Sequence, residues 1–281
     1  RFWFNNNPGL ALPLIALQYH DVRINIEIED IAYLIRNDNG NITAPENVDG
    51  GLLDIKDCQL VVNYIYLDTD ERRRFAQVSH EYLIEQVQFL GLESINSNET
   101  NHPINLNFNH PVKVLHWVLQ DTTFVQNNSV DSVNDNKLFD SGNQKLRYQS
   151  LSKINNKYDT FQTGKIQING HDRMVEKNAD YFRLVQNYQH MNGTSNKYIY
   201  TYSFALNPSE HQPSGTCNFS RIDIAKLYLT FDKKTTSQNT KTDGVTTYTG
   251  QVTNNLHAKV FAVNYNVLRI MSGMGGLAYS N

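Results

Sequence analysis

Residues 64–88 read YIYLDTDERRRFAQVSHEYLIEQVQ, and the character of the chain changes inside this stretch. Asp68, followed three residues later by Glu71, is typical of a helix start, where carboxylates lie at the positive end of the helix dipole. From His80 onward the side chains fall into two alternating sets, which is the period of a strand. The sequence therefore predicts a short helix or turn over Asp68–Ser79 that links two sandwiches, and a strand that begins near His80.

The chain beyond this stretch contains short runs of β-branched and aromatic residues separated by polar segments. The predicted strands are Glu81–Phe89, Ile104–Phe108, Val112–Leu119, Thr163–Ile168, Tyr198–Ala205, Phe219–Phe231, His257–Tyr265 and Val267–Met271. One further short helix is predicted near Asn178–Tyr188, from apolar residues at helical spacing: Tyr181, Leu184, Val185 and Tyr188. So many strands with so little helix favour an all-β, two-sheet sandwich. A jelly roll is the leading topology, although alternation alone leaves an immunoglobulin-like sandwich open.

Two strand signals precede the opening stretch, at Gln18–Glu27 and Cys58–Tyr66. In the first, Val22, Ile24 and Ile26 alternate with polar residues, so that one face of the strand would be buried. Two or three strands do not form a stable sheet alone, so residues 1–66 are expected to complete a larger domain. The chain starts without a methionine or a signal pattern, and we expect it to be part of a longer protein.

Composition excludes several classes of protein. The formal charge of the 281 residues is −3 with no basic tract, which argues against direct nucleic-acid binding. No run of 18 apolar residues is present, so no transmembrane segment is predicted. Cys58 and Cys217 lie far apart, which supports neither a disulfide framework nor a zinc cluster and fits a reducing compartment. The 16 Tyr and 13 Phe exceed what one core needs and fit a protein that associates with itself.

Two motifs that carry chemistry in other proteins are incomplete here. His80-Glu81 begins like the zinc motif H-E-x-x-H, but its fifth position is Ile84 and the segment has the period of a strand. Gly273-x-Gly275-x-x-Ala278 matches the dinucleotide fingerprint in form but has no helix after it. A flexible glycine-rich segment packed closely against a neighbour is the better interpretation. We therefore expect no cofactor and no metal.

A charged cluster lies at the predicted linker helix. Asp68, Asp70 and Glu71 could in principle serve acid–base catalysis, but capping and ion pairing beside the arginines explain them better. The arginines, Arg72, Arg73 and Arg74, are interpreted first as a solvated helix face and second as a subunit contact. With no catalytic constellation elsewhere, the sequence predicts a protein that is not an enzyme.

Five asparagines begin N-x-[ST] sequons: Asn41, Asn98, Asn127, Asn192 and Asn218. In a chain so rich in asparagine most such matches arise by chance, so glycosylation is the minor interpretation at each of them.

Four segments of the chain resemble one protein family, the major capsid protein of nucleocytoplasmic large DNA viruses. They are residues 64–88 as quoted above, Phe2–His20 with its FWF and PGLALPLIALQYH, Ser214–Asp223 (SGTCNFSRID) and Ala262–Asn281 (AVNYNVLRIMSGMGGLAYSN). They occur in the order in which the family has them and span almost the whole chain.

The resemblance implies a double jelly roll, with residues 1–66 as the last strands of the first roll and 67–281 as the second roll. It implies a homotrimer that forms a pseudo-hexagonal capsomer and tiles an icosahedral shell with neighbouring capsomers and minor capsid proteins. Such a shell is commonly built over an internal membrane and is assembled in the infected host cell, in the cytoplasm. A lectin-like carbohydrate-binding jelly roll is the alternative function. A cupin-type enzyme shares the architecture but requires clustered histidines as metal ligands.

The polar segments 121–160 and 232–256 are too long for hairpin turns and are predicted as loops. If the capsid resemblance holds, they lie on the outer face of the capsomer, where loops are free to lengthen. Leu151 is then expected to pack against the same loop of an adjacent subunit, which makes it a further candidate subunit contact.

Overall fold

The structure is a computed structural model and describes residues 2–27, 57–96, 98–121, 159–193, 198–231 and 255–280. These residues group into two compact units. The described parts of the first unit are 2–27, 57–84 and 266–280, and those of the second lie between residues 85 and 265. The two long strands β1 (His80–Ile95) and β10 (Leu256–Met271) each contribute residues to both units.

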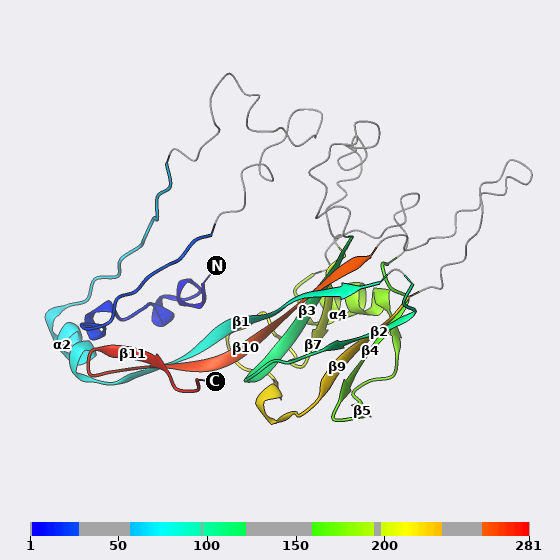
Figure 1. Cartoon of the computed structure of the whole chain (residues 1–281). Coiled ribbons are helices and arrows are strands. Elements are labelled where there is room, and N and C mark those ends of the chain that lie inside the picture. The colour runs from blue at the N-terminus through cyan, green and yellow to red at the C-terminus, as the bar shows by residue number, and fades with distance from the viewer. Residues whose placement is uncertain are drawn as a thin grey trace, which may run out of the picture. The chain divides into compact units, whose positions relative to one another are not determined.

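A six-stranded sheet has the strand order β1-β10-β3-β7 (Figure 1). Two short strands join this path, β11 on β10 and β8 on β3. The bounds of the four strands not yet given are β3 (Pro111–Asp121), β7 (Tyr200–Ser203), β8 (Cys217–Asn218) and β11 (Met274–Leu277). The last long strand of the chain is thus hydrogen-bonded between the first and the third.

A five-stranded sheet has the order β2-β9-β4-β5, with β6 also on β4. Its strands are β2 (Asn101–Asn105), β4 (Thr163–Ile168), β5 (His171–Asp172), β6 (Lys177–Asn178) and β9 (Ala225–Thr230). From β1 to β4 successive strands alternate between the two sheets, and so do β7, β9 and β10. This is the jelly-roll topology that the sequence favoured, now distinct from an immunoglobulin-like one.

Alternate residues of the strands form the core of the sandwich. β9 buries every second side chain, among them Leu227 and Leu229, and β10 does the same with Ala258 and Val260. At the centre Trp117 packs edge-on against Phe182, with ring centroids 5.2 Å apart, and lies 6.0 Å from the ring of Tyr200. Offset and edge-to-face aromatic pairs of this kind add to the free energy of burial.

The predicted strand Thr163–Ile168 agrees with β4 at both ends, but other bounds differ. The predicted strands His257–Tyr265 and Val267–Met271 form the single strand β10, because the amide groups of its buried asparagines find partners. Asn264 accepts a hydrogen bond from Gln88 Nε2 (3.0 Å), and Asn266 donates one to the carbonyl of Tyr279 (2.9 Å). Buried polar groups that are hydrogen-bonded cost little.

The predicted strand Phe219–Phe231 is shorter in the structure. Its first three residues form the 3-10 helix η7 (Phe219–Arg221), because the side chain of Asn218 accepts a hydrogen bond from Ser220 N (3.1 Å) and caps it. The predicted helix is present as two consecutive pieces, the π-helix η6 (Tyr181–Val185) and the α-helix α4 (Gln186–His190).

The first unit contains the helix predicted from residues 64–88. It is α2 (Thr69–Gln77), and Asp68 caps it by accepting a hydrogen bond from Glu71 N (2.9 Å). The strand β1 begins at His80, as predicted. Three short 3-10 helices precede it in the chain: η1 (Trp3–Asn5), η2 (Pro8–Leu10) and η3 (Leu14–Ala16). No helix in the described part of the chain is long and apolar enough to cross a membrane.

The predictions of strands at Gln18–Glu27 and Cys58–Tyr66 are wrong for the residues that the structure describes. Residues 20–27 and 57–66 belong to no helix or strand, and their apolar side chains are exposed, as at Val61 and Tyr66. Alternation gives a strand one apolar face, but the backbone also needs a neighbouring ladder, and no described strand pairs with either segment.

The glycine-rich C-terminal segment is ordered as a hairpin rather than flexible. β10 and β11 pair from Leu268↔Leu277 to Met271↔Met274, and Gly273 at the turn has a φ of +83°. Tyr19 N donates a hydrogen bond to the carbonyl of Gly273 (2.9 Å), and a Cβ on Gly273 would lie 2.5 Å from the Tyr19 ring. The close approach to a neighbour that the sequence predicted is therefore confirmed.

Candidate functional site: an assembly surface

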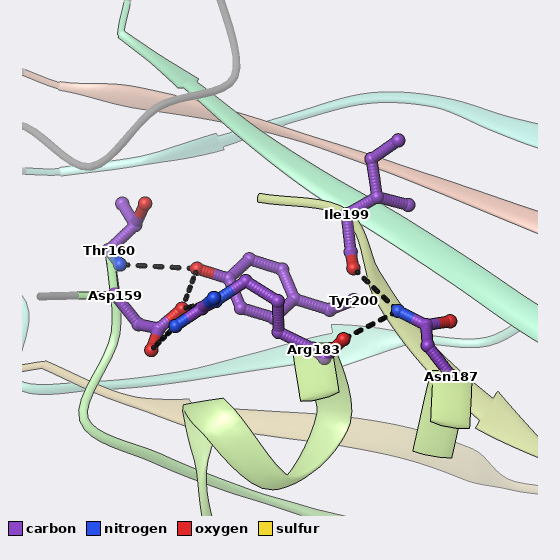
Figure 2. A network of polar contacts seen from close by, with 6 residues as sticks. All are labelled: Asp159, Thr160, Arg183, Asn187, Ile199 and Tyr200. Atoms are coloured by element: carbon purple, nitrogen blue, oxygen red, sulfur yellow. Dashed lines mark hydrogen bonds and ion pairs between the residues drawn. The ribbon is translucent and has the colours of Figure 1, made fainter. Parts of the chain in front are cut away.

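A buried polar network joins the helical segment η6–α4 to the sandwich (Figure 2). Arg183 Nε donates to Asp159 Oδ1 at 2.6 Å, and the second guanidinium nitrogen donates to Oδ2 at 3.1 Å. The hydroxyl of Tyr200 donates to Asp159 Oδ1 and accepts from Thr160 N, both at 3.2 Å. Burial raises the pKa of Tyr200 far above its ordinary value, so this phenol stays protonated.

Two amide side chains extend this network toward β7. Asn187 Nδ2 donates to the carbonyl of Arg183 at 2.6 Å and to that of Ile199 at 3.4 Å, as Figure 2 shows. Gln186 Oε1 accepts from Ser203 N at 3.0 Å. These bonds hold the helical segment by its polar side chains, so the network has a structural explanation and needs no substrate.

The helical segment presents most of its apolar side chains outward. Leu184, Val185 and Tyr188, whose spacing with Tyr181 predicted this helix, are exposed. Of these four residues only Tyr181 packs against the core. The buried positions are Phe182, Gln186 and Asn187, because the wider π-helical turn shifts the inward face.

A second buried charge lies in the six-stranded sheet. Lys113 on β3 is only 3% exposed, and its Nζ lies 2.6 Å from Glu85 Oε1 on β1. The ammonium also sits 5.1 Å above the ring of Tyr265, whose pKa is raised to about 12 by burial and by the nearby Glu85. A cation that has a carboxylate and an aromatic face is satisfied within the fold, and the arrangement is that of a structural pair.

The residues of the incomplete chemical motifs have structural partners. His80 Nε2 lies 2.8 Å from the carbonyl of Phe75. Asp70 pairs with Arg73 at 3.9 Å, so capping and ion pairing account for the carboxylates at α2 as expected. Both cysteines are free, and burial raises the pKa of the Cys217 thiol. Within the described ranges no three histidine, cysteine or carboxylate side chains are grouped as metal ligands would be.

The predicted contact and glycosylation residues divide into two sets. Arg72, Arg73 and Arg74 are exposed on α2. So are the sequon residues Asn98, Asn192 and Asn218. Leu151, Asn41 and Asn127 lie outside the described residues, as do 122–158 and 232–254 of the predicted loops.

The exposed apolar side chains of the second unit are its most distinctive surface feature. One group lies on the helical segment, with Leu206 next to it, since His190 Nδ1 lies 2.8 Å from the Leu206 carbonyl. A second group lies on β1 and includes Val87, Phe89 and Leu92, with Phe89 stacked on Phe261 of β10 at 4.8 Å. The sequence predicted the helix that carries the first group but not which of its side chains are exposed, because helical spacing alone does not say what covers a helix face.

The second unit is thus a jelly-roll sandwich in which several large apolar side chains are exposed. Two family models match this chain: large eukaryotic DNA virus major capsid protein over residues 71–276, and major capsid protein N-terminus over residues 1–68. The chain belongs to the major capsid protein family of large eukaryotic DNA viruses, a family of structural capsid proteins.

Individual relatives agree with this membership. The chain is 45% identical to the major capsid protein of Pyramimonas orientalis virus and 41% identical to that of Paramecium bursaria Chlorella virus 1. All of the chain is covered in both comparisons, together with 60% and 65% of the respective relatives. Among solved structures, it matches the crystal structure of VP54 from the latter virus with a TM-score of 0.70 and 36% identity, over 100% of this chain and 69% of VP54.

Proposed function

We propose that this chain acts as a structural subunit of a viral shell, as part of a homotrimeric, pseudo-hexagonal capsomer that tiles an icosahedral capsid. The observation that carries the proposal is the match of the whole chain to VP54 at 36% identity. A quasi-atomic model of the capsid of the same virus matches it with a TM-score of 0.65 and 33% identity. The exposed apolar side chains of the second unit supply the kind of surface that such assembly requires.

The division of the chain is part of this proposal. Residues 1–66 would be the last strands of a first jelly roll and 67–281 the second roll. Two observations support it: the two family models meet between residues 68 and 71, and α2 with its Asp68 cap lies at that place. The apolar segments 20–27 and 57–66, which pair with no described strand, would find their ladder partners in the rest of the first roll.

The same proposal also names the partners of the chain. They are two further copies of the chain, neighbouring capsomers and minor capsid proteins, in a virion built over an internal membrane and assembled in the host cytoplasm. Arg72, Arg73, Arg74 and Leu151 are proposed subunit contacts. Of the five possible glycosylation sites, Asn98, Asn192 and Asn218 are exposed, and Asn41 and Asn127 lie outside the described residues. The near-neutral charge of −3 argues against direct contact with nucleic acid, and we propose no catalytic role.

Light scattering on the whole protein as it elutes from a sizing column tests the proposal. A stable trimer is expected, which electron microscopy should show as a pseudo-hexagonal particle. A monomer or dimer that binds glycans on an array would contradict the capsid function and support the lectin-like one.

A further inference from the structure

His102 lies at one end of the sandwich with a carboxylate at each nitrogen of its ring. It is a residue of β2, and its side chain is only 12% exposed. On one side its Nδ1 contacts Oε2 of Glu99, a residue of the connection from β1 to β2. On the other side its Nε2 lies 3.4 Å from Oε1 of Glu93, which belongs to β1. The two carboxylates therefore share one imidazole ring.

These contacts join the two sheets of the sandwich. β1 belongs to the six-stranded sheet and β2 to the five-stranded sheet, so the two strands share no backbone ladder. In the connection between them, Glu99 N donates to the carbonyl of Asn96 at 3.0 Å, and Asn96 Nδ2 donates to Glu99 Oε1, also at 3.0 Å. The side chain of His102 thus joins the end of β1 to the start of β2.

The charge of the ring decides how strong this junction is. A neutral histidine has a single N–H, and with that hydrogen on Nδ1 the ring donates to Glu99. Nε2 of His102 is buried and makes no hydrogen bond, so in the neutral ring its lone pair faces the Glu93 carboxylate. A proton on Nε2 replaces this repulsion by attraction. It also supplies a cation to two carboxylates that, among the described residues, are paired with no lysine or arginine.

The neighbouring strands determine which other groups this proton would meet. β9 places Leu229 opposite His102 and Thr230 opposite Asn101, and neither is charged. β10 contributes His257, whose Nδ1 lies 3.3 Å from Oγ of Ser94 on β1. Glu99 already responds to the ring, because the hydrogen bond from His102 lowers the pKa of its carboxyl group.

We propose that His102 is a proton-dependent clamp, which joins β1 to β2 firmly when its ring is protonated and loosens this end of the sandwich when its ring is neutral. Histidine is the side chain that ordinarily gains its proton within the physiological range of pH. This end of the sandwich is therefore more stable in weak acid than in weak alkali. The inference goes beyond the proposed function, since it concerns a single subunit and holds with or without assembly.

Hydrogen exchange followed by mass spectrometry tests the clamp in the whole protein, because it reads the amides of residues 98–105 separately from the rest of the chain. Exchange is measured at about pH 8 and about pH 5.5, on either side of the ordinary histidine range, and corrected for the intrinsic rate. Protection of this segment should rise about fivefold in the wild-type protein as the pH falls, the effect of a partly solvated ion pair. His102→Gln still donates one hydrogen bond but gains no proton, so its protection should not rise.

Two glutamates on β1 provide a matched pair of variants. Glu93→Gln removes one carboxylate of the clamp at a side chain that is 51% exposed, and it should reduce the rise to about twofold. Glu81→Gln is the control, because Glu81 is 56% exposed and pairs with Arg269, whose charge does not change in this range. It should leave the fivefold rise intact, and so should His257→Gln, which removes the neighbouring histidine.

Each other result decides against the proposal. Equal protection at the two pH values in the wild-type protein, or lower protection in acid, means that no such clamp exists. A rise that persists in His102→Gln comes from another group. A full rise in Glu93→Gln means that His102 does not join the two sheets. If His102→Gln fails to fold, the wild-type protein and Glu93→Gln still decide, and all of these readouts are independent of whether the chain forms a trimer.

Discussion

Strand β9 and the segment 58–66 have similar sequence patterns and very different structures. Both contain large aliphatic and aromatic residues, and both were predicted as strands. β9 pairs with β2 on one side and with β4 on the other, and it buries Leu227 and Leu229 completely. The segment 58–66 pairs with no described strand, and Val61 is 85% exposed. An apolar pattern thus indicates which side chains gain from burial. Whether the segment forms a strand depends on the neighbouring strands with which its backbone can pair.

The largest expected difference between the two regions is in how much free energy of unfolding is lost when an apolar side chain is truncated. Trp117→Ala in the sandwich should lower the free energy of unfolding by about 4 kcal/mol, because it leaves a cavity between Phe182 and Tyr200. Val61→Ala should change it by less than about 0.5 kcal/mol. Urea unfolding of the two variants measures both values. A loss of similar size for Val61→Ala would mean that this segment is packed in solution and would remove the contrast.

A pH titration probes the six-stranded sheet through His116 of β3. Burial lowers the pKa of this imidazole to about 4, and Thr201 Oγ1 lies 3.0 Å from its Nδ1. The unfolded chain takes up the proton near the ordinary value of 6.5, so the folded state loses stability as the pH falls from about 6.5 to about 4. The loss amounts to about 3 kcal/mol. Unfolding free energies at several pH values should show it, and His116→Gln should remove this part of the slope. An unchanged slope in the variant would contradict the assignment.

The C-terminal hairpin shows that part of the first unit does have paired strands, unlike the segment 58–66. Gly273→Ala should cost about 2 kcal/mol, because alanine disfavours a positive φ and its methyl group would meet the Tyr19 ring. Gly276→Ala is the matched control, since nothing lies within 4 Å of a Cβ there. Thermal unfolding of both variants provides the measurement. Equal melting temperatures would indicate that Tyr19 does not pack on the turn.

The smallest effect on the free energy of unfolding is expected for a substitution on the surface of the sandwich. Asp172 accepts a hydrogen bond from Lys165 Nζ at 2.9 Å, which lowers the pKa of the carboxyl group, but both side chains are solvated. Asp172→Asn should therefore leave stability within the error of urea unfolding. A clear loss of stability would show that surface ion pairs such as Lys165–Asp172 contribute to the stability of the five-stranded sheet.

Local signals in the sequence predicted much of the fold. The cap at Asp68, the strand start at His80 and both ends of β4 follow from residues close together in the chain. The jelly roll itself followed from the number of strand signals and from the family resemblance. Local propensity and period were sufficient where each segment also has its sheet neighbours.

The candidate site was less predictable because its determinants are not local. Asp159, Arg183 and Tyr200 are brought together from separate segments, and no spacing rule marks such a network. The π-helical turn of η6 sets which side chains face inward, and Phe182, Gln186 and Asn187 are buried although the 3.6-residue spacing of the apolar residues does not mark them. Segments 20–27 and 58–66 carry the apolar residues of a strand, but the strands that would pair with them cannot be identified from the segments themselves.

The position of β10 between β1 and β3 determines when the six-stranded sheet can form during synthesis of the chain. Until the ribosome has released residues 256–271, β1 and β3 have no strand between them, and the six-stranded sheet cannot close. Pairing over such a separation along the chain is slow, and the waiting strand edges can capture other nascent chains. A polysome that translates this message therefore carries many unfinished sheets at once. Sheet closure, and every association that needs a closed sheet, is deferred until β10 has been synthesised.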